Sequence, residues 1–170
     1  MKLLINIDKN NYQGLTKKLK REASRAIIKK GDELLLVKMK NGFYKFPGGG
    51  INFSESKEHA LIREVKEETG YQVLPSSIKE YGYIKEQERS NKKRMIFVQY
   101  SYFYNAQVEN EFQEQELETY EADLDLKPEW IKIEDAYKTN LSFIEEHGED
   151  EFRFLKRESL MLKYLLEKNY

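Results

Sequence analysis

The sequence contains no cysteine, two histidines and three prolines among its 170 residues. Without cysteine, a disulfide framework, a thiolate nucleophile and a zinc–thiolate site are excluded. No run of about 18 apolar residues occurs, so we expect no transmembrane helix. The opening stretch MKLLINIDKNN lacks the long apolar core and the small-residue cleavage site of a signal peptide. These absences predict a cytoplasmic protein.

The chain also has little net charge, because 29 Lys and Arg residues nearly balance 30 Asp and Glu residues. A formal charge of −1 creates no global field that would recruit an anionic membrane or nucleic acid, so neither is expected as a partner. The early part of the chain is locally basic, and we interpret it as a solvated segment rather than a phosphate clamp. Its cations are Lys17, Lys18, Lys20, Arg21 and Arg25.

Apolar runs and turn residues predict a sheet. The runs 25–29 and 33–39 flank Lys30-Gly31-Asp32, a composition typical of a hairpin turn. Leu34–Val37 is continuously apolar rather than alternating, which predicts a strand covered on both faces. Further strands are expected near 81–86 and over 94–105, with an edge strand or a loosely attached arm within 1–20. The length predicts one domain over residues 1–170.

Three glutamates share one face of an expected helix. At about 100° per residue, Glu64, Glu67 and Glu68 fall within an arc of about 100°. The adjoining arc is apolar and is expected to face the core; it contains Leu61, Ile62, Val65 and Thr69. Such a pattern alone is typical of a solvated face. It also suits a divalent cation, which prefers hard oxygen ligands and would relieve the repulsion between the carboxylates.

The surrounding residues favour the second interpretation. One stretch reads Gly49, five residues, Glu55, seven residues and then REVKEETGY. This pattern resembles the Nudix box, G-x5-E-x7-R-E-U-x-E-E-x-G-U, where U is bulky and apolar. The box covers residues 49–71, and its one departure is Tyr71 in place of an aliphatic residue. The preceding Phe46-Pro47-Gly48-Gly49 is similar to the usual lead-in of the family. Ser54 or Ser56 is expected to cap the box helix at its start, and Gly70 at its end.

The resemblance implies an α/β fold, the Nudix-type α/β/α sandwich with a mixed sheet. The box helix would cover one face and a C-terminal helix, about residues 150–168, another. It implies hydrolysis of a nucleoside diphosphate linked to another moiety, dependent on Mg²⁺ or Mn²⁺, with MutT-like nucleotide clean-up as one form of this activity. The expected partner is therefore a small nucleoside diphosphate derivative. A non-catalytic nucleotide sensor on the same fold is the alternative, and a homodimer is compatible with the sequence.

The resemblance also assigns roles to individual residues. The carbonyl of Gly48 and the carboxylates of Glu64, Glu67 and Glu68 would bind the metal. Glu55 would pair with Arg63 and fix the loop against the helix, so that Gly49, Glu55, Arg63 and Gly70 are structural residues of the box.

A further carboxylate is expected from the acidic segment before Trp130, because in the family such a loop often completes the metal site or supplies the base. Glu121 is the first choice and Glu118 the second, whereas Glu109 and Glu111 are expected to face solvent. Catalysis is thus assigned to Glu64, Glu68 and Glu121, without a decision on which is the general base. His59 has no partner at metal-ligand spacing and is interpreted as a surface residue.

Overall fold

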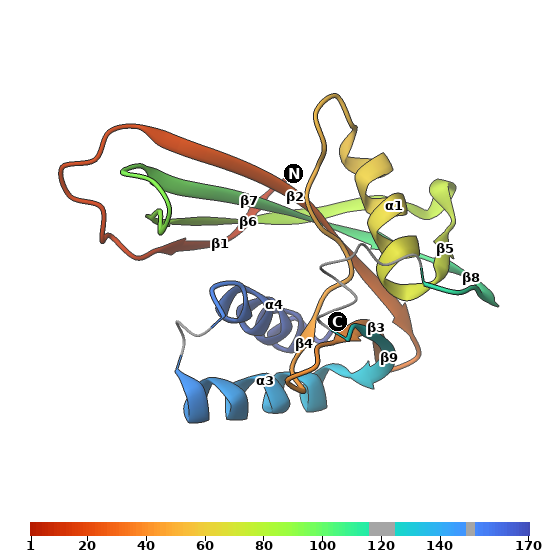
Figure 1. Cartoon of the computed structure of the whole chain (residues 1–170). Helices are drawn as coiled ribbons and strands as arrows, with labels where there is room; N and C mark the ends of the chain where they lie inside the picture. Colours follow the sequence, from red (N-terminus) through yellow and green to blue (C-terminus); the bar gives the residue numbers. More distant parts are fainter. Residues whose placement is uncertain (116–124, 149–151) are drawn as a thin grey trace.

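The computed structural model describes residues 1–115, 125–148 and 152–170 (Figure 1). Its strands are β1 (Leu3–Asp8), β2 (Lys18–Lys30), β3 (Glu33–Lys38), β4 (Tyr44–Lys45), β5 (Tyr71–Val73), β6 (Lys79–Arg89), β7 (Ile96–Ala106), β8 (Val108–Phe112) and β9 (Lys127–Lys132). The helices are α1 (Lys57–Thr69), α3 (Ile133–His147) and α4 (Leu155–Glu167), with the 3-10 turn η1 (Pro75–Ser77).

The main sheet is mixed and has seven strands. Its order is β1-β6-β7-β2-β3-β4, with β9 paired to β3, while β5 and β8 form a separate pair. The β1–β6 and β2–β7 pairs are parallel, and the other pairs are antiparallel. The edge strand expected within residues 1–20 is therefore confirmed as β1, and the hairpin at Lys30–Asp32 as the β2–β3 connection.

The two strands of that hairpin separate soon after the turn, and the glycine-rich segment lies along the edge of β2. Only Lys29 and Lys30 of β2 pair with β3. Beyond them, residues 47–51 bond to β2 through backbone hydrogen bonds from Ala26 N to Pro47 O (2.9 Å), Ser24 N to Gly49 O (3.0 Å) and Ile51 N to Glu22 O (3.1 Å). The segment that precedes the box helix is thus fixed to the middle of the sheet.

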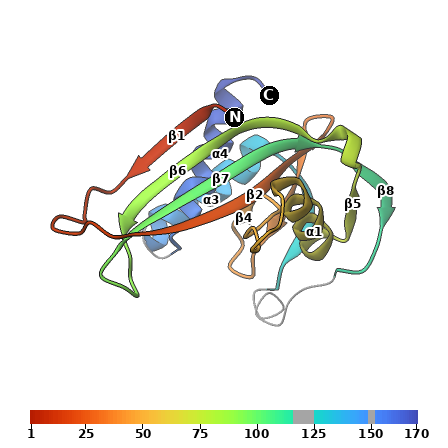
Figure 2. The ribbon, with the colours of Figure 1, turned by 90° about the horizontal axis from the view of Figure 1, so that it is seen from above.

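Helices lie on both faces of this sheet (Figure 2). Apolar side chains pack between the sheet and these helices. Successive residues of a strand point to opposite faces. Accordingly, Ile27 belongs to the core beneath α4, and Ala26 and Ile28 to the core beneath α1. All four residues of Leu34–Val37 are fully buried, which confirms a strand covered on both faces. The expected α/β/α sandwich is confirmed. None of the helices in the described parts has the length and apolarity needed to span a membrane.

Local rules place the two ends of α1. The Ser56 hydroxyl accepts a hydrogen bond from the His59 N–H at 3.1 Å and caps the first turn. At the other end Gly70 has φ of 70°, the left-handed conformation that glycine adopts without steric cost. Between them Leu61 and Val65 are fully buried. The box residues therefore form a helix with its apolar stripe against the sheet.

Candidate active site

Two of the three box glutamates are buried against the glycine-rich segment. Glu64 is 7% exposed and Glu68 1% exposed. One carboxylate oxygen of Glu68 accepts a hydrogen bond from the Gly48 N–H at 3.0 Å, and the other is paired with the Lys45 ammonium group. The acidic face of α1 is therefore turned toward the protein interior rather than solvated.

Position 49 leaves no room for a side chain while Glu64 keeps its present position, because the backbone approaches that carboxylate closely. A Cβ atom added to Gly49 would lie 2.1 Å from Oε2 of Glu64, far inside van der Waals contact. Any side chain here would displace the carboxylate or the loop. This contact explains, in this chain, why the box begins with a glycine.

Arg63 organises the outer part of the same face. Its Nη1 donates to Oε1 of Glu64 and to Oε2 of Glu67, both at 2.9 Å. Its Nη2 donates to the Gly50 carbonyl and to Oε2 of Glu55, both at 3.0 Å, and its Nε donates to Oε1 of Glu55 at 2.9 Å. The hydrogen bonds from Arg63 hold the pKa of the Glu55 carboxyl below its ordinary value. One cation thus joins three carboxylates and the loop.

Burial changes the protonation of Glu64. Loss of solvent, followed by the negative charge of Glu68, raises the pKa of the Glu64 carboxyl to about 7, although Arg63 opposes the shift. Two buried carboxylates side by side are costly to keep ionised without nearby positive charge. Lys45 and Arg63 supply such charge, and the raised pKa of Glu64 indicates that they do not fully offset its burial.

Arg25 corrects the interpretation of the basic early segment. It was expected to be solvated, but it is only 7% exposed and donates through Nη1 to the carbonyls of Gly48 and Phe46, the latter at 3.3 Å. Its Nε is buried and has no hydrogen-bond partner among the described residues. The expectation failed because β2 alternates: Arg21 and Arg25 point to the same face, which borders a cavity.

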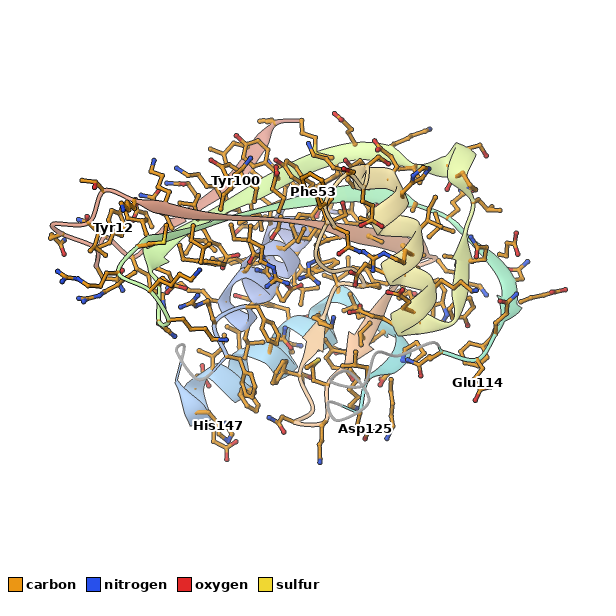
Figure 3. All side chains as sticks on the ribbon, turned by 45° about the horizontal axis from the view of Figure 1, so that its top comes forward. Tyr12, Phe53, Tyr100, Glu114, Asp125 and His147 are labelled. Carbon is orange, nitrogen blue, oxygen red and sulfur yellow. The ribbon has the colours of Figure 1, made fainter. Side chains whose placement is uncertain are left out.

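That cavity has a volume of about 510 Å³ and includes Glu64 and Glu68 in its wall. Cationic side chains line much of the rest of the wall: Arg21, Arg25, Lys45, Lys92, Lys93, Arg153 and Arg157. Phe97 and Phe154 contribute apolar surface to the cavity. Tyr100 does not line it: this half-buried side chain lies on the opposite side of the sheet from α4 (Figure 3). The box carboxylates therefore open into a space large enough for a small molecule.

A buried ion-pair network connects the C-terminal helix to the glycine-rich segment. Arg157 donates to Glu86 at 2.6 Å and to Glu158 at 2.7 Å. Glu158 in turn accepts from the Phe46 N–H at 2.9 Å. Burial alone would raise the pKa of the Glu158 carboxyl, but Arg157 and Arg25 outweigh it and lower that pKa. Sequence reasoning missed this network, because nothing in the amphipathic pattern of α4 marks Arg157 as buried.

Comparison with known protein families shows the family to which the chain belongs. Residues 19–157 match the model of the NUDIX domain, well over half of the chain. The chain belongs to the Nudix family. In sequence it is 46% identical over 48 residues to an ADP-ribose pyrophosphatase of Methanocaldococcus jannaschii. This match covers 26% of this chain and 28% of that protein.

A second relative is a Bacillus subtilis protein provisionally named 8-oxo-dGTP diphosphatase YtkD, 42% identical over 59 residues, or 35% of this chain and 36% of that protein. The matches thus span about a third of these relatives. In structure the chain is similar to the MutT protein of Bacillus halodurans, with a TM-score of 0.54 and 23% identity over 70% of this chain and 72% of that one. This likeness supports the Nudix fold.

The Nudix site offers hard oxygen ligands to a divalent metal. The available donors are hard oxygens, namely the carboxylates of Glu64, Glu67 and Glu68 and the Gly48 carbonyl, and Gly49 leaves the backbone close to them. This donor set fits Mg²⁺ or Mn²⁺. Within residues 1–115, 125–148 and 152–170, however, no three acidic or histidine side chains are arranged as a metal cluster. Instead Arg63 and Lys45 pair with the carboxylates.

The other residues for which the sequence made a prediction are the glutamates of the acidic segment and His59. Glu109 and Glu111 are exposed, as expected, and so is Glu114 at the periphery of the molecule (Figure 3). Glu118 and Glu121 lie outside the described residues, so their assignment stays a prediction. His59 is exposed, which confirms the interpretation of a surface histidine.

Proposed function

We propose that this Nudix protein is a hydrolase that cleaves a phosphoric anhydride bond in a nucleoside diphosphate linked to another moiety. The observation that carries the proposal is the burial of Glu64 and Glu68 against Gly48 and Gly49 in the wall of the cavity. Burial of two carboxylates costs free energy of folding. Holding a divalent cation beside a bound diphosphate is a function that would explain this cost.

Glu64, Glu67, Glu68 and the Gly48 carbonyl would hold Mg²⁺ or Mn²⁺. When bound, the metal would neutralise diphosphate oxygens and acidify a water molecule. For this to occur, Lys45 and Arg63 must exchange at least part of their present contacts with the carboxylates, and Arg25 must release or share the Gly48 carbonyl. Arg63 retains its two bonds to Glu55 as an anchor, so the loop can stay in place.

The chain's own side chains would bind and orient the substrate. Arg25 and Lys45 lie beside the glycine-rich segment, where their charges can attract diphosphate oxygens. Phe97 and Phe154 line the same cavity and offer apolar surface to a nucleoside. A carboxylate must accept the proton of the attacking water, and Glu64, Glu68 and Glu121 are the candidates for this base.

The names of the relatives indicate which substrates to test first. One is named for ADP-ribose and another for 8-oxo-dGTP, so a panel should contain both, with other nucleoside diphosphate derivatives. The purified chain is incubated with each compound and Mg²⁺, and phosphate-containing products are separated by chromatography. We expect cleavage of at least one compound. Cleavage of none, by a folded protein, would contradict the proposal.

One observation favours the alternative, a nucleotide-binding sensor without catalysis. Lys45 and Arg63 neutralise the box carboxylates internally, which would allow the fold to bind a nucleotide without metal. A sensor would bind panel compounds in the presence of chelator and release them unchanged. Metal-dependent product formation distinguishes the two proposals directly.

We also propose that residues 1–170 form one Nudix domain. β1 precedes the matched residues 19–157 and α4 extends beyond them, yet both pack onto the same sheet. Limited proteolysis should therefore leave β1 and α4 attached to the rest of the chain. The cytoplasmic location and the homodimer stay expectations, to be tested by fractionation and by the mass of the purified protein in solution.

A further inference from the structure

The segment from Phe46 to Gly48, which leads into the box, is held by three charged side chains from three different elements. The Phe46 N–H donates to Oε2 of Glu158 on α4 at 2.9 Å. The Gly48 N–H donates to Oε2 of Glu68 on α1 at 3.0 Å. The carbonyls of both residues accept from Nη1 of Arg25 on β2. The backbone N–H and C=O of Phe46 and of Gly48 thus all have a charged partner.

Two of these three side chains are involved when the site takes a metal. Glu68 is itself an expected ligand, and Arg25 now binds the Gly48 carbonyl, which is another. Their contacts with the segment therefore change on metal binding. Glu158 is different, because it is fully buried and lies outside the cavity wall. Its bond to the Phe46 N–H is thus the charged contact that can keep the segment in place in both states.

The carboxylate of Glu158 is itself fixed by the network around it. Arg157 donates to Oε1 of Glu158 through Nε at 3.0 Å and through Nη2 at 2.7 Å, which leaves Oε2 for the Phe46 N–H. The remaining Nη1 of Arg157 donates to Glu86 on β6 at 2.6 Å and ties the pair to the sheet. Charge-assisted, two-point pairing of this kind fixes orientation as well as distance. Glu158 is therefore an immobile anchor for the segment.

We propose that Glu158 is a positioning residue of the metal site, which holds the Gly48 carbonyl in place through the Phe46 N–H. Arg157 orients Glu158 and acts one step further away. This inference rests on the proposed function and adds a residue of α4, outside the box, to those that set the affinity for metal. Groups that orient metal ligands commonly change this affinity by about 10- to 100-fold when they are substituted.

The test is a binding measurement that needs neither substrate nor turnover. Mn²⁺ is titrated into the full chain, and the unbound ion is quantified by electron paramagnetic resonance, for wild type and for E158Q. Glutamine has a single acceptor oxygen, so it cannot serve both Arg157 and the Phe46 N–H. We therefore expect the Kd for Mn²⁺ to rise at least about tenfold in E158Q.

The control L165A separates positioning from stability. Leu165 is fully buried on the same helix, seven residues or about 10 Å beyond Glu158. L165A should lower the melting temperature and keep the Mn²⁺ affinity of wild type. Thermal melting shows which variants are folded. If E158Q does not fold, E158D takes its place: it keeps the charge, but its side chain is one methylene too short to reach both partners, so it should also weaken Mn²⁺ binding.

The inference is overturned if the folded Glu158 variant binds Mn²⁺ as tightly as wild type, because Glu158 would then stabilise the fold alone. It is also overturned if L165A weakens binding as much, or if wild type binds no Mn²⁺. Failure of the proposed function looks different. In that case the loss of Mn²⁺ affinity in the Glu158 variant persists, but no nucleoside diphosphate derivative is hydrolysed.

Discussion

Glu55 and Arg63 share two hydrogen bonds, from Nε to Oε1 at 2.9 Å and from Nη2 to Oε2 at 3.0 Å. This arrangement joins the loop before α1 to the second turn of the helix. Planar, two-point pairing of this kind fixes orientation as well as distance. Because the same guanidinium also binds Glu64 and Glu67, the geometry of the whole acidic face depends on the pair.

The first prediction concerns the pH dependence of this pair. The folded-state pKa of Glu55 lies below its ordinary value of 4.5, so its contribution to stability is present above that pH and is lost as pH falls through the lowered pKa. E55Q should lower the free energy of unfolding by about 1 kcal/mol at pH 7. Urea unfolding measures this, and the difference from wild type should shrink below pH 4.5. A difference that grows in acid would contradict the assignment.

Glu68→Gln separates chemistry from folding. The amide oxygen can still accept a hydrogen bond from the Gly48 N–H, and only the ion pair with Lys45 is lost, so we expect the fold to be kept at reduced stability. Loss of a metal ligand or a base should lower turnover by at least about 100-fold. The matched control is E58Q, on the exposed first turn of the same helix, which should leave turnover unchanged. Near-normal turnover in E68Q would mean that the site is misplaced.

Leu61→Ala should have the opposite effect. Leu61 is fully buried in the core beneath α1, and its truncation should cost about 2–5 kcal/mol of unfolding free energy. I62A, at a half-buried neighbour, should cost less. Turnover per folded molecule should stay close to that of wild type in both variants. A large loss of turnover at unchanged stability would show that Leu61 affects the site itself.

The extra carboxylate is tested by substitution, because Glu121 and Glu118 lie outside the described residues. A carboxylate from this segment would enclose the metal from the side that α1 leaves open. E121Q should then lower turnover by at least about 100-fold, and E118Q should do so only if Glu121 is the wrong choice. The exposed Glu109 supplies the control, E109Q. Normal turnover in both E121Q and E118Q would assign the base to α1.

The parts of the fold that follow from local rules were predictable from the sequence. Ser56 caps α1 through a bond to a residue three positions on, and Gly70 ends it with a positive φ. The burial of Leu34–Val37 followed from its continuous apolar run. The Glu55–Arg63 pair was expected from the family motif, whose spacing places the two residues on adjoining elements.

Contacts between distant segments could not be predicted in the same way. Lys45 of β4 pairs with Glu68 near the end of α1, and Arg157 of α4 pairs with Glu86 of β6. Arg25 was misjudged because a basic run in sequence does not show which residues of a strand point inward. These contacts depend on tertiary packing, and they define the charge of the cavity.

Metal dependence tests the central claim most directly. Turnover of a panel substrate such as ADP-ribose is measured after exhaustive dialysis against chelator, and again after addition of Mg²⁺ or Mn²⁺, for wild type and for E68Q. If the box carboxylates hold a divalent cation, hydrolysis vanishes in chelator and returns with metal in wild type, while E68Q stays at least about 100-fold slower at the same metal concentration. Undiminished hydrolysis by the metal-free wild-type chain would contradict the account.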